Sequence, residues 1–182
     1  MSRTYKVFII MIGLGVAFQI GHFIEHLVQF LMWVFSDRTK PWMSPIAEWL
    51  TMCLSKVTDT GICGTTSKPM AVGMELLHLT GNTIFLATIF MLLLRDLING
   101  FVLNHYTYWA FIIEGLHLCE HLALTISVIL TGHALGVSTL FGHISSFPID
   151  TAVGYRVTFH FVMNLIPSIL LMLALRKGDR DV

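Results

Sequence analysis

The chain has 182 residues, of which 55% are apolar and only 12% are charged, and its formal net charge is zero. An average soluble chain carries about 25% charged residues, so this composition predicts a protein of the lipid bilayer rather than a soluble domain. Nucleic acid is excluded as an expected partner, because the chain has no excess of basic residues to neutralise phosphates.

Four segments are long and apolar enough for membrane-spanning helices, which need roughly 20 mainly apolar residues. They lie at about 7–35, 71–94, 105–131 and 152–175. Arg3 and Lys6 precede the first segment as in a signal peptide, but no small-x-small cleavage site follows, so we expect a retained helix. The sequence therefore predicts an all-α integral membrane protein, a four-transmembrane-helix bundle forming a single membrane domain over residues 1–182.

Two longer connections separate these segments. In the first, residues 45–54 are mainly apolar and, with Trp42 and Trp49, favour a short interfacial helix on the outer surface. Cys53 and Cys63 lie in the same connection, where they would form a disulfide in an oxidising compartment or remain two free thiols. The second connection, at about 132–151, carries His133 and His143 among several glycines and could cap the bundle.

The distribution of basic residues predicts the orientation. Arginines and lysines are densest in the short segments at the N-terminus, around Arg95 and at the C-terminus, whereas those on the other side are spread over long loops. Under the positive-inside rule this asymmetry places both termini in the cytoplasm.

The chain also repeats itself. Residues 22–26 and 117–121 both read H-x-x-E-H, whereas residues 78–82 and 160–164 both read H-x-x-x-N and follow an Ala-Val-Gly triplet. The order A-B-A′-B′ predicts an internal two-fold pseudo-repeat, with repeat 1 at about 7–94 and repeat 2 at about 105–175. With the N-terminus inside, all four motifs reach a similar depth in the outer half of the bilayer.

The repeated polar residues predict a metal site. An ionisable side chain in the membrane interior costs about 2.5–3.5 kcal/mol, so these residues should face one another or a ligand. Positions i, i+3 and i+4 share one helix face, and imidazole with carboxylate is a ligand set of transition metals. The predicted ligands are His22, Glu25, His26, His78, His117, Glu120, His121 and His160, oriented by Asn82, Asn164, Glu114 and Gln29.

The favoured function is therefore a membrane-embedded metal-binding protein with a mono- or dinuclear site, associated with redox or oxygenase chemistry or with metal storage. Copper or iron is favoured and zinc is an option, because Met70, Met74 and His78 fall on one helix face and thioethers suit cuprous copper. Four alternatives stay open: a bis-histidine haem b electron carrier, a metal-ion or proton transporter, an accessory subunit of a membrane oxidase or monooxygenase, and a purely structural hydrogen-bond network.

One specific contact is also predicted. Glu75 and Arg156 each lie four residues after the alanine that opens the Ala-Val-Gly triplet of their repeat. We expect them to form an ion pair near the outer surface that locks the helices together.

Overall fold

The computed structural model describes residues 3–36, 39–58, 69–98 and 104–178. Within these residues the chain forms helices and no strand. The elements are α1 (Arg3–Phe35), α2 (Pro45–Thr58), α3 (Pro69–Ile98), α4 (His105–Thr131), the 3₁₀ helix η1 (Val137–Ser146) and α5 (Ile149–Gly178).

Four of these helices, α1, α3, α4 and α5, are long and apolar enough to cross a membrane. Each contains one of the segments predicted from the sequence, so the expectation of an all-helical chain with four apolar spans is confirmed. A continuous helix is the natural state of such a segment, because it satisfies every internal backbone N–H and C=O without water.

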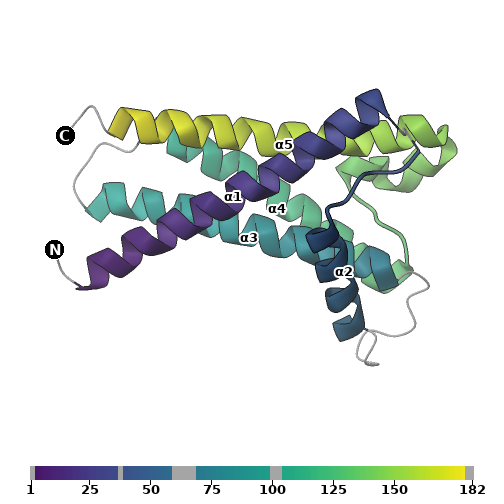
Figure 1. Cartoon of the computed structure of the whole chain (residues 1–182), viewed down its shortest axis with the longest axis horizontal. Helices are drawn as coiled ribbons and strands as arrows, with labels where there is room; N and C mark the ends of the chain where they lie inside the picture. The colour runs from purple at the N-terminus through teal and green to yellow at the C-terminus, as the bar shows by residue number, and fades with distance from the viewer. Residues whose placement is uncertain (1–2, 37–38, 59–68, 99–103, 179–182) are drawn as a thin grey trace.

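The four long helices pack in a closed ring in which α1 contacts α3, α3 contacts α4, α4 contacts α5 and α5 contacts α1. Figure 1 shows that α1 and α4 run in one direction and that α3 and α5 return. The start of α1 and the end of α5 therefore lie at the same end of the molecule, opposite α2. We call this the terminal end and the other the loop end.

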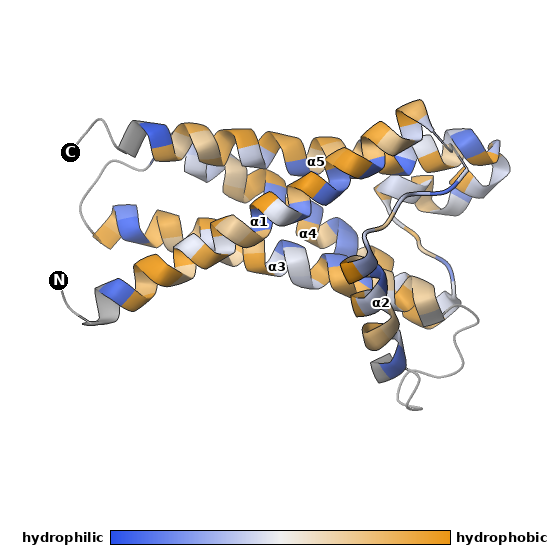
Figure 2. Ribbon diagram, viewed as in Figure 1, coloured by the Kyte–Doolittle hydropathy of each residue, from blue (hydrophilic) through white to orange (hydrophobic). Residues whose placement is uncertain are grey.

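The long helices consist mainly of hydrophobic residues along most of their length (Figure 2). Leu14, Leu116 and Leu130 are each more than 60% exposed, and many other large apolar side chains on these helices are exposed as well. Such a surface is unfavourable in water but suits contact with lipid chains.

A cluster of buried apolar residues fills the ring toward the terminal end. Its members come from all four long helices and are Ile12, Phe85, Ile89, Leu92, Ala110 and Leu171. Because these aliphatic and aromatic side chains meet in the middle of the ring, they form a mainly apolar core there, beside which Thr88 and Thr107 are also buried.

Helix α2 forms where the first connection was predicted to be helical and packs against α3. Its small residues Ala47, Thr51 and Ser55 recur every fourth position and are all buried, which brings the two backbones close together. A Cβ atom on Gly73 would overlap the Thr51 carbonyl oxygen, so glycine is required there. Cys53 is exposed, whereas Cys63 lies outside the described residues, and so does the choice between a disulfide and two free thiols.

The second connection is more ordered than the sequence suggested, because it contains η1. The chain passes through left-handed backbone conformations at Leu140, Phe141 and Gly142, with φ of 48°, 52° and 91°. No helical periodicity is visible in this part of the sequence, because the element is a short 3₁₀ segment interrupted by this bend.

Candidate functional site

Six histidines from the four long helices converge inside the loop half of the ring. They are His22 and His26 of α1, His78 of α3, His117 and His121 of α4, and His160 of α5. Neighbouring ring centroids lie between 4.6 Å, for His22 and His26, and 6.0 Å, for His26 and His160. Four of the six are buried, and His117 and His121 are completely so.

Three of these residues are close enough to share one ion. His117, His121 and His160 each offer a ring nitrogen, and these nitrogens all lie within 4.8 Å of one another. All three side chains are buried, and they come from the adjacent helices α4 and α5. We refer to them as the α4–α5 triad.

The Nδ1 atoms of three of the histidines, His78, His121 and His160, face fixed oxygen acceptors. Nδ1 of His78 donates to the Met74 carbonyl and Nδ1 of His160 to the Arg156 carbonyl, both at 2.8 Å. Nδ1 of His121 donates to Oε2 of Glu75 at 3.3 Å. Because carbonyl and carboxylate oxygens only accept, the proton sits on Nδ1 and the lone pair on Nε2. This tautomer is the one that a histidine needs to bind a metal through Nε2.

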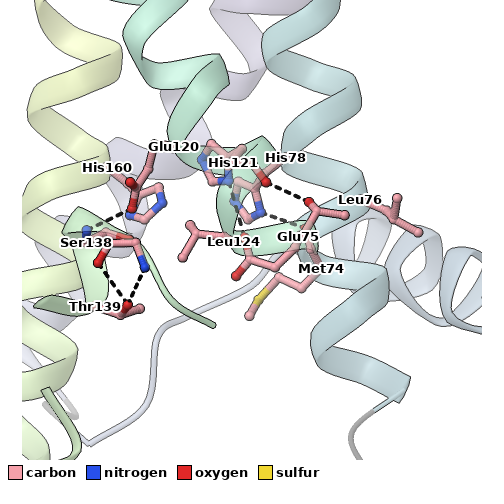
Figure 3. A network of polar contacts seen from close by, with 12 residues as sticks. Met74, Glu75, Leu76, His78, Glu120, His121, Leu124, Ser138, Thr139 and His160 are labelled. Atoms are coloured by element: carbon pink, nitrogen blue, oxygen red, sulfur yellow. Dashed lines mark hydrogen bonds and ion pairs between the residues drawn. The ribbon is translucent and has the colours of Figure 1, made fainter. Parts of the chain in front are cut away.

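Glu75 of α3 lies beside His121 at the loop side of the histidine cluster (Figure 3). One carboxylate oxygen receives the His121 hydrogen bond, and the other lies 2.9 Å from Nη2 of Arg156. The predicted Glu75–Arg156 ion pair is therefore confirmed. What the sequence did not reveal is that Glu75 also orients a histidine, because that contact depends on how α3 and α4 are rotated against each other.

A second polar layer lies one helical turn from the histidines toward the terminal end. Oε2 of Glu114 is 3.6 Å from Nδ1 of His117, and both carboxylate oxygens of Glu114 are buried without a hydrogen-bond partner. Gln19, which precedes His22 as Glu114 precedes His117, donates to Asn164 at 3.3 Å. Asn164 in turn donates to the His160 carbonyl at 2.9 Å, and Asn82 completes the layer as a buried residue.

The two glutamates of the H-x-x-E-H motifs bind backbone amides of the loops. Glu25 accepts a hydrogen bond from the Ser44 N–H at 3.1 Å, just before α2. Glu120 accepts from Val137 at 2.9 Å and from Ser138 at 2.8 Å, at the start of η1. The structure thus places both carboxylates on the loops that follow their helices, an arrangement that motif spacing alone does not reveal.

Glu120 is expected to hold η1 in place. Replacing it by alanine removes the acceptor for two backbone N–H groups, each worth about 1 kcal/mol or more when the acceptor is charged. Amide hydrogen exchange should then accelerate by roughly 10-fold or more in residues 137–146. The matched change Glu48→Ala, at an exposed glutamate of α2, should leave exchange in this segment unchanged. Equal protection of η1 in both variants would contradict the anchoring role.

The ring geometry matches in pairs across the site. His22 and His78 have centroids 6.0 Å apart with planes at 63°, and His117 and His160 have centroids 5.9 Å apart with planes at 63°. His78 stacks on His121 at 5.0 Å, and His26 stacks on His160 at 6.0 Å. The two pairs in each comparison are equivalent under the internal repeat, in which α1 corresponds to α4 and α3 to α5.

Two pockets reach the histidines from different sides. The larger, of about 420 Å³, lies among α1, α2 and α3 and has His22, His26 and His78 on its wall. The smaller, of about 220 Å³, includes Glu75 and Arg156 among its lining residues and reaches His121 and His160. Gln29, which hydrogen-bonds to His26 at 3.1 Å, borders both pockets.

Some predicted residues stand apart from this cluster. His133 and His143 of the second connection are exposed on the surface. Met70 is 45% exposed, and Met74 contacts His78 through its carbonyl oxygen. Gln19 and Glu75 are the residues that sequence reasoning left out of the site. The sequence spacing could have identified both residues, because each lies three residues before a motif histidine and therefore shares its helix face.

The fold and site define a class: an all-helical chain with four apolar helices, of the kind that multi-pass membrane proteins have, with a buried histidine cluster. Residues 1–181 match the family model described as "Family of unknown function (DUF6008)", and the chain belongs to this family. No curated protein and no solved structure shows significant similarity to the chain.

Proposed function

We propose that this protein is a multi-pass membrane metalloprotein whose four long helices form a transmembrane bundle around a transition-metal site. The terminal end would face the cytoplasm, in keeping with the dense basic residues at both termini. The histidines then lie in the outer half of the bilayer. Helix α2 would rest at the outer interface, since Ile46 and Trp49 on its free face are 72% and 59% exposed.

The observation that carries this proposal is the α4–α5 triad with its unpaired nitrogens. Nε2 of His121 and both ring nitrogens of His117 are buried without a hydrogen-bond partner. An unsatisfied buried polar group costs about 1–3 kcal/mol, and a metal ion removes several such costs at once. Ligands of a tetrahedral zinc at about 2.1 Å lie roughly 3.4 Å apart, so modest ring rotations from the present spacing would close the site.

The groups around the triad also suit a cation. Glu75 accepts a hydrogen bond from His121 while it pairs with Arg156, and Glu114 lies beside His117, so two carboxyl groups flank the three imidazoles. This donor set suits iron, copper or zinc. The proposed ligands are the histidines, because Glu25 and Glu120 already bind loop amides.

A haem fits this geometry less well than an ion. Each histidine has at least two other imidazoles nearby, with ring centroids between 4.6 and 6.0 Å apart. A porphyrin plane placed between any two of them would therefore cut through the others. A haem site needs apolar packing around one axial ligand on each face, which a cluster of six imidazoles does not provide.

A static site is also favoured over a transport pathway. The apolar cluster that contains Phe85 and Ile89, both 0% exposed, lies between the polar layers and the terminal end. An ion crossing the membrane would have to pass this mainly apolar cluster, at a large desolvation cost.

Elemental analysis of the purified full-length protein tests the proposal. We expect a transition metal to copurify, or to bind stably on reconstitution, and His121→Gln to lower its affinity strongly. The control is His105→Gln, which changes an exposed histidine at the start of α4. A chain that stays metal-free after reconstitution with iron, copper and zinc salts would refute the proposal. An absorption spectrum of the same sample would show a haem directly.

A further inference from the structure

We infer that the site holds a second metal ion, bound by His22, His26 and His78 at the junction of α1 and α3. These three residues are called the α1–α3 triad below. The inference rests on the proposed metal function and adds to it a second binding site, with an open side that faces the larger pocket.

The first support is the equivalence of the two triads in the chain. Each takes two histidines from an H-x-x-E-H helix and one from the H-x-x-x-N helix that follows it. In both cases these two helices pack directly on each other, α1 on α3 and α4 on α5. The α1–α3 triad therefore occupies the position that corresponds to the α4–α5 triad.

The second support is the geometry of the rings. The three separations within the α1–α3 triad are 4.6, 5.5 and 6.0 Å, and those within the α4–α5 triad are 4.9, 4.9 and 5.9 Å. Two stacked pairs join the triads, His78 on His121 and His26 on His160. They are equivalent to each other under the internal repeat. An arrangement that can bind an ion on one side is thus repeated on the other.

The third support is the state of the nitrogens. Nε2 of His22 and Nε2 of His26 are buried without a hydrogen-bond partner. His78 donates its Nδ1 proton to the carbonyl four residues before it, as His160 does in the other triad. Three imidazole lone pairs are thus available beside one another, and no protein donor occupies those of His22 and His26.

The two sites are unequal, and the differences predict their properties. Among the described residues, only the α4–α5 triad brings its ligand atoms within 4.8 Å, so the α1–α3 triad is the wider one. Glu75 hydrogen-bonds to His121 and Glu114 lies beside His117 in the closer triad, whereas the residue that hydrogen-bonds to His26 in the wider one is the neutral Gln29. Because an amide takes the place of a carboxylate and a pocket of about 420 Å³ is adjacent, the second ion should bind more weakly and keep an exchangeable position.

The walls of this pocket indicate what reaches that position. Phe18, Ile24, Val28, Leu50 and Leu77 line it, and its other walls are mostly apolar as well. Its polar lining residues besides the histidines include Glu25, Gln29 and Ser44. The exchangeable position therefore faces a mainly apolar pocket. Such a pocket suits a small ligand better than a pathway for hydrated ions.

The test is metal stoichiometry with Co²⁺ as the probe, on the full chain purified in detergent. Wild-type protein should bind two ions in two steps of different affinity, followed by cobalt absorption and elemental analysis. His22→Gln and His78→Gln should abolish the weaker step and keep the tighter one. The equivalent change His160→Gln should remove the tighter step. His105→Gln is the control and should retain two ions.

The outcomes separate this inference from the metal function itself. One ion per wild-type chain, retained in His22→Gln, would overturn the second site and leave the first. One ion that is lost in both His22→Gln and His160→Gln would mean a single ion shared by the two triads, which also overturns it. No bound ion would refute both proposals. If His78→Gln fails to fold, His22→Gln decides, because His22 is only partly buried.

Discussion

Replacing Glu75 by leucine is expected to lower the free energy of unfolding by about 3 kcal/mol, the lower end of the range for breaking a buried ion pair. The carboxylate is 3% exposed and pairs with Arg156 at 2.9 Å, so its loss leaves a cation beside the histidines without a counter-ion. The lower end applies because the Arg156 side chain is 31% exposed and can still reach water. Unfolding in mixed detergent micelles would measure the loss.

The same change should weaken the proposed metal binding by about 10- to 100-fold, because Glu75 orients His121 and supplies negative charge. Glu75→Gln should be milder in both measurements, since the amide oxygen can still accept from Nδ1 of His121. The double variant Glu75→Leu with Arg156→Leu should recover part of the stability and none of the affinity. Wild-type stability of Glu75→Leu would show that the ion pair does not lock the helices.

Gly73→Ala is expected to destabilise the protein by about 1–3 kcal/mol, the usual cost of overpacking. The added methyl group would overlap the Thr51 carbonyl oxygen and approach the Ser55 N–H, and both belong to the backbone of α2. Backbone atoms within a helix cannot move aside singly, so α2 as a whole must shift away from α3. Because α2 borders the larger pocket, protease sensitivity should rise in residues 45–58.

Gly13→Ala is the matched control, because a Cβ atom there meets nothing within 4 Å. Alanine favours the helix by about 0.5–1 kcal/mol over glycine, so this variant should be neutral or slightly stabilised. Similar unfolding curves for the two variants would mean that α2 does not pack against Gly73 as the structure shows.

The spans and the ion pair illustrate what sequence alone can predict. Runs of apolar residues determine membrane helices locally, because a helix satisfies its backbone within the segment. Helical periodicity places side chains at i, i+3 and i+4 on one face, and this was sufficient to group His22 with His26 and His117 with His121. The repeat then indicated that residues such as Glu75 and Arg156 occupy matching positions.

The contacts of the motif glutamates could not be predicted from the sequence. Glu25 and Glu120 have the spacing of ligands, yet each binds a backbone amide of the loop that follows its helix. Whether a carboxylate contacts a histidine or a loop depends on the path that the chain takes after its helix ends. Helical periodicity does not predict the path of a loop. The bend in η1, the element that brings Ser138 to Glu120, likewise has no recognisable sequence pattern.

The sequence by itself determined four apolar helices, their histidines, and the faces on which those histidines lie, because these properties are local to each helix. The tertiary structure decided which histidines approach within reach of one ion, and that Glu75 rather than Glu120 orients His121. It also decided that apolar side chains from all four long helices meet toward the terminal end. These features depend on how neighbouring helices are rotated and spaced, and small-residue contacts such as Gly73 against Thr51 set that spacing.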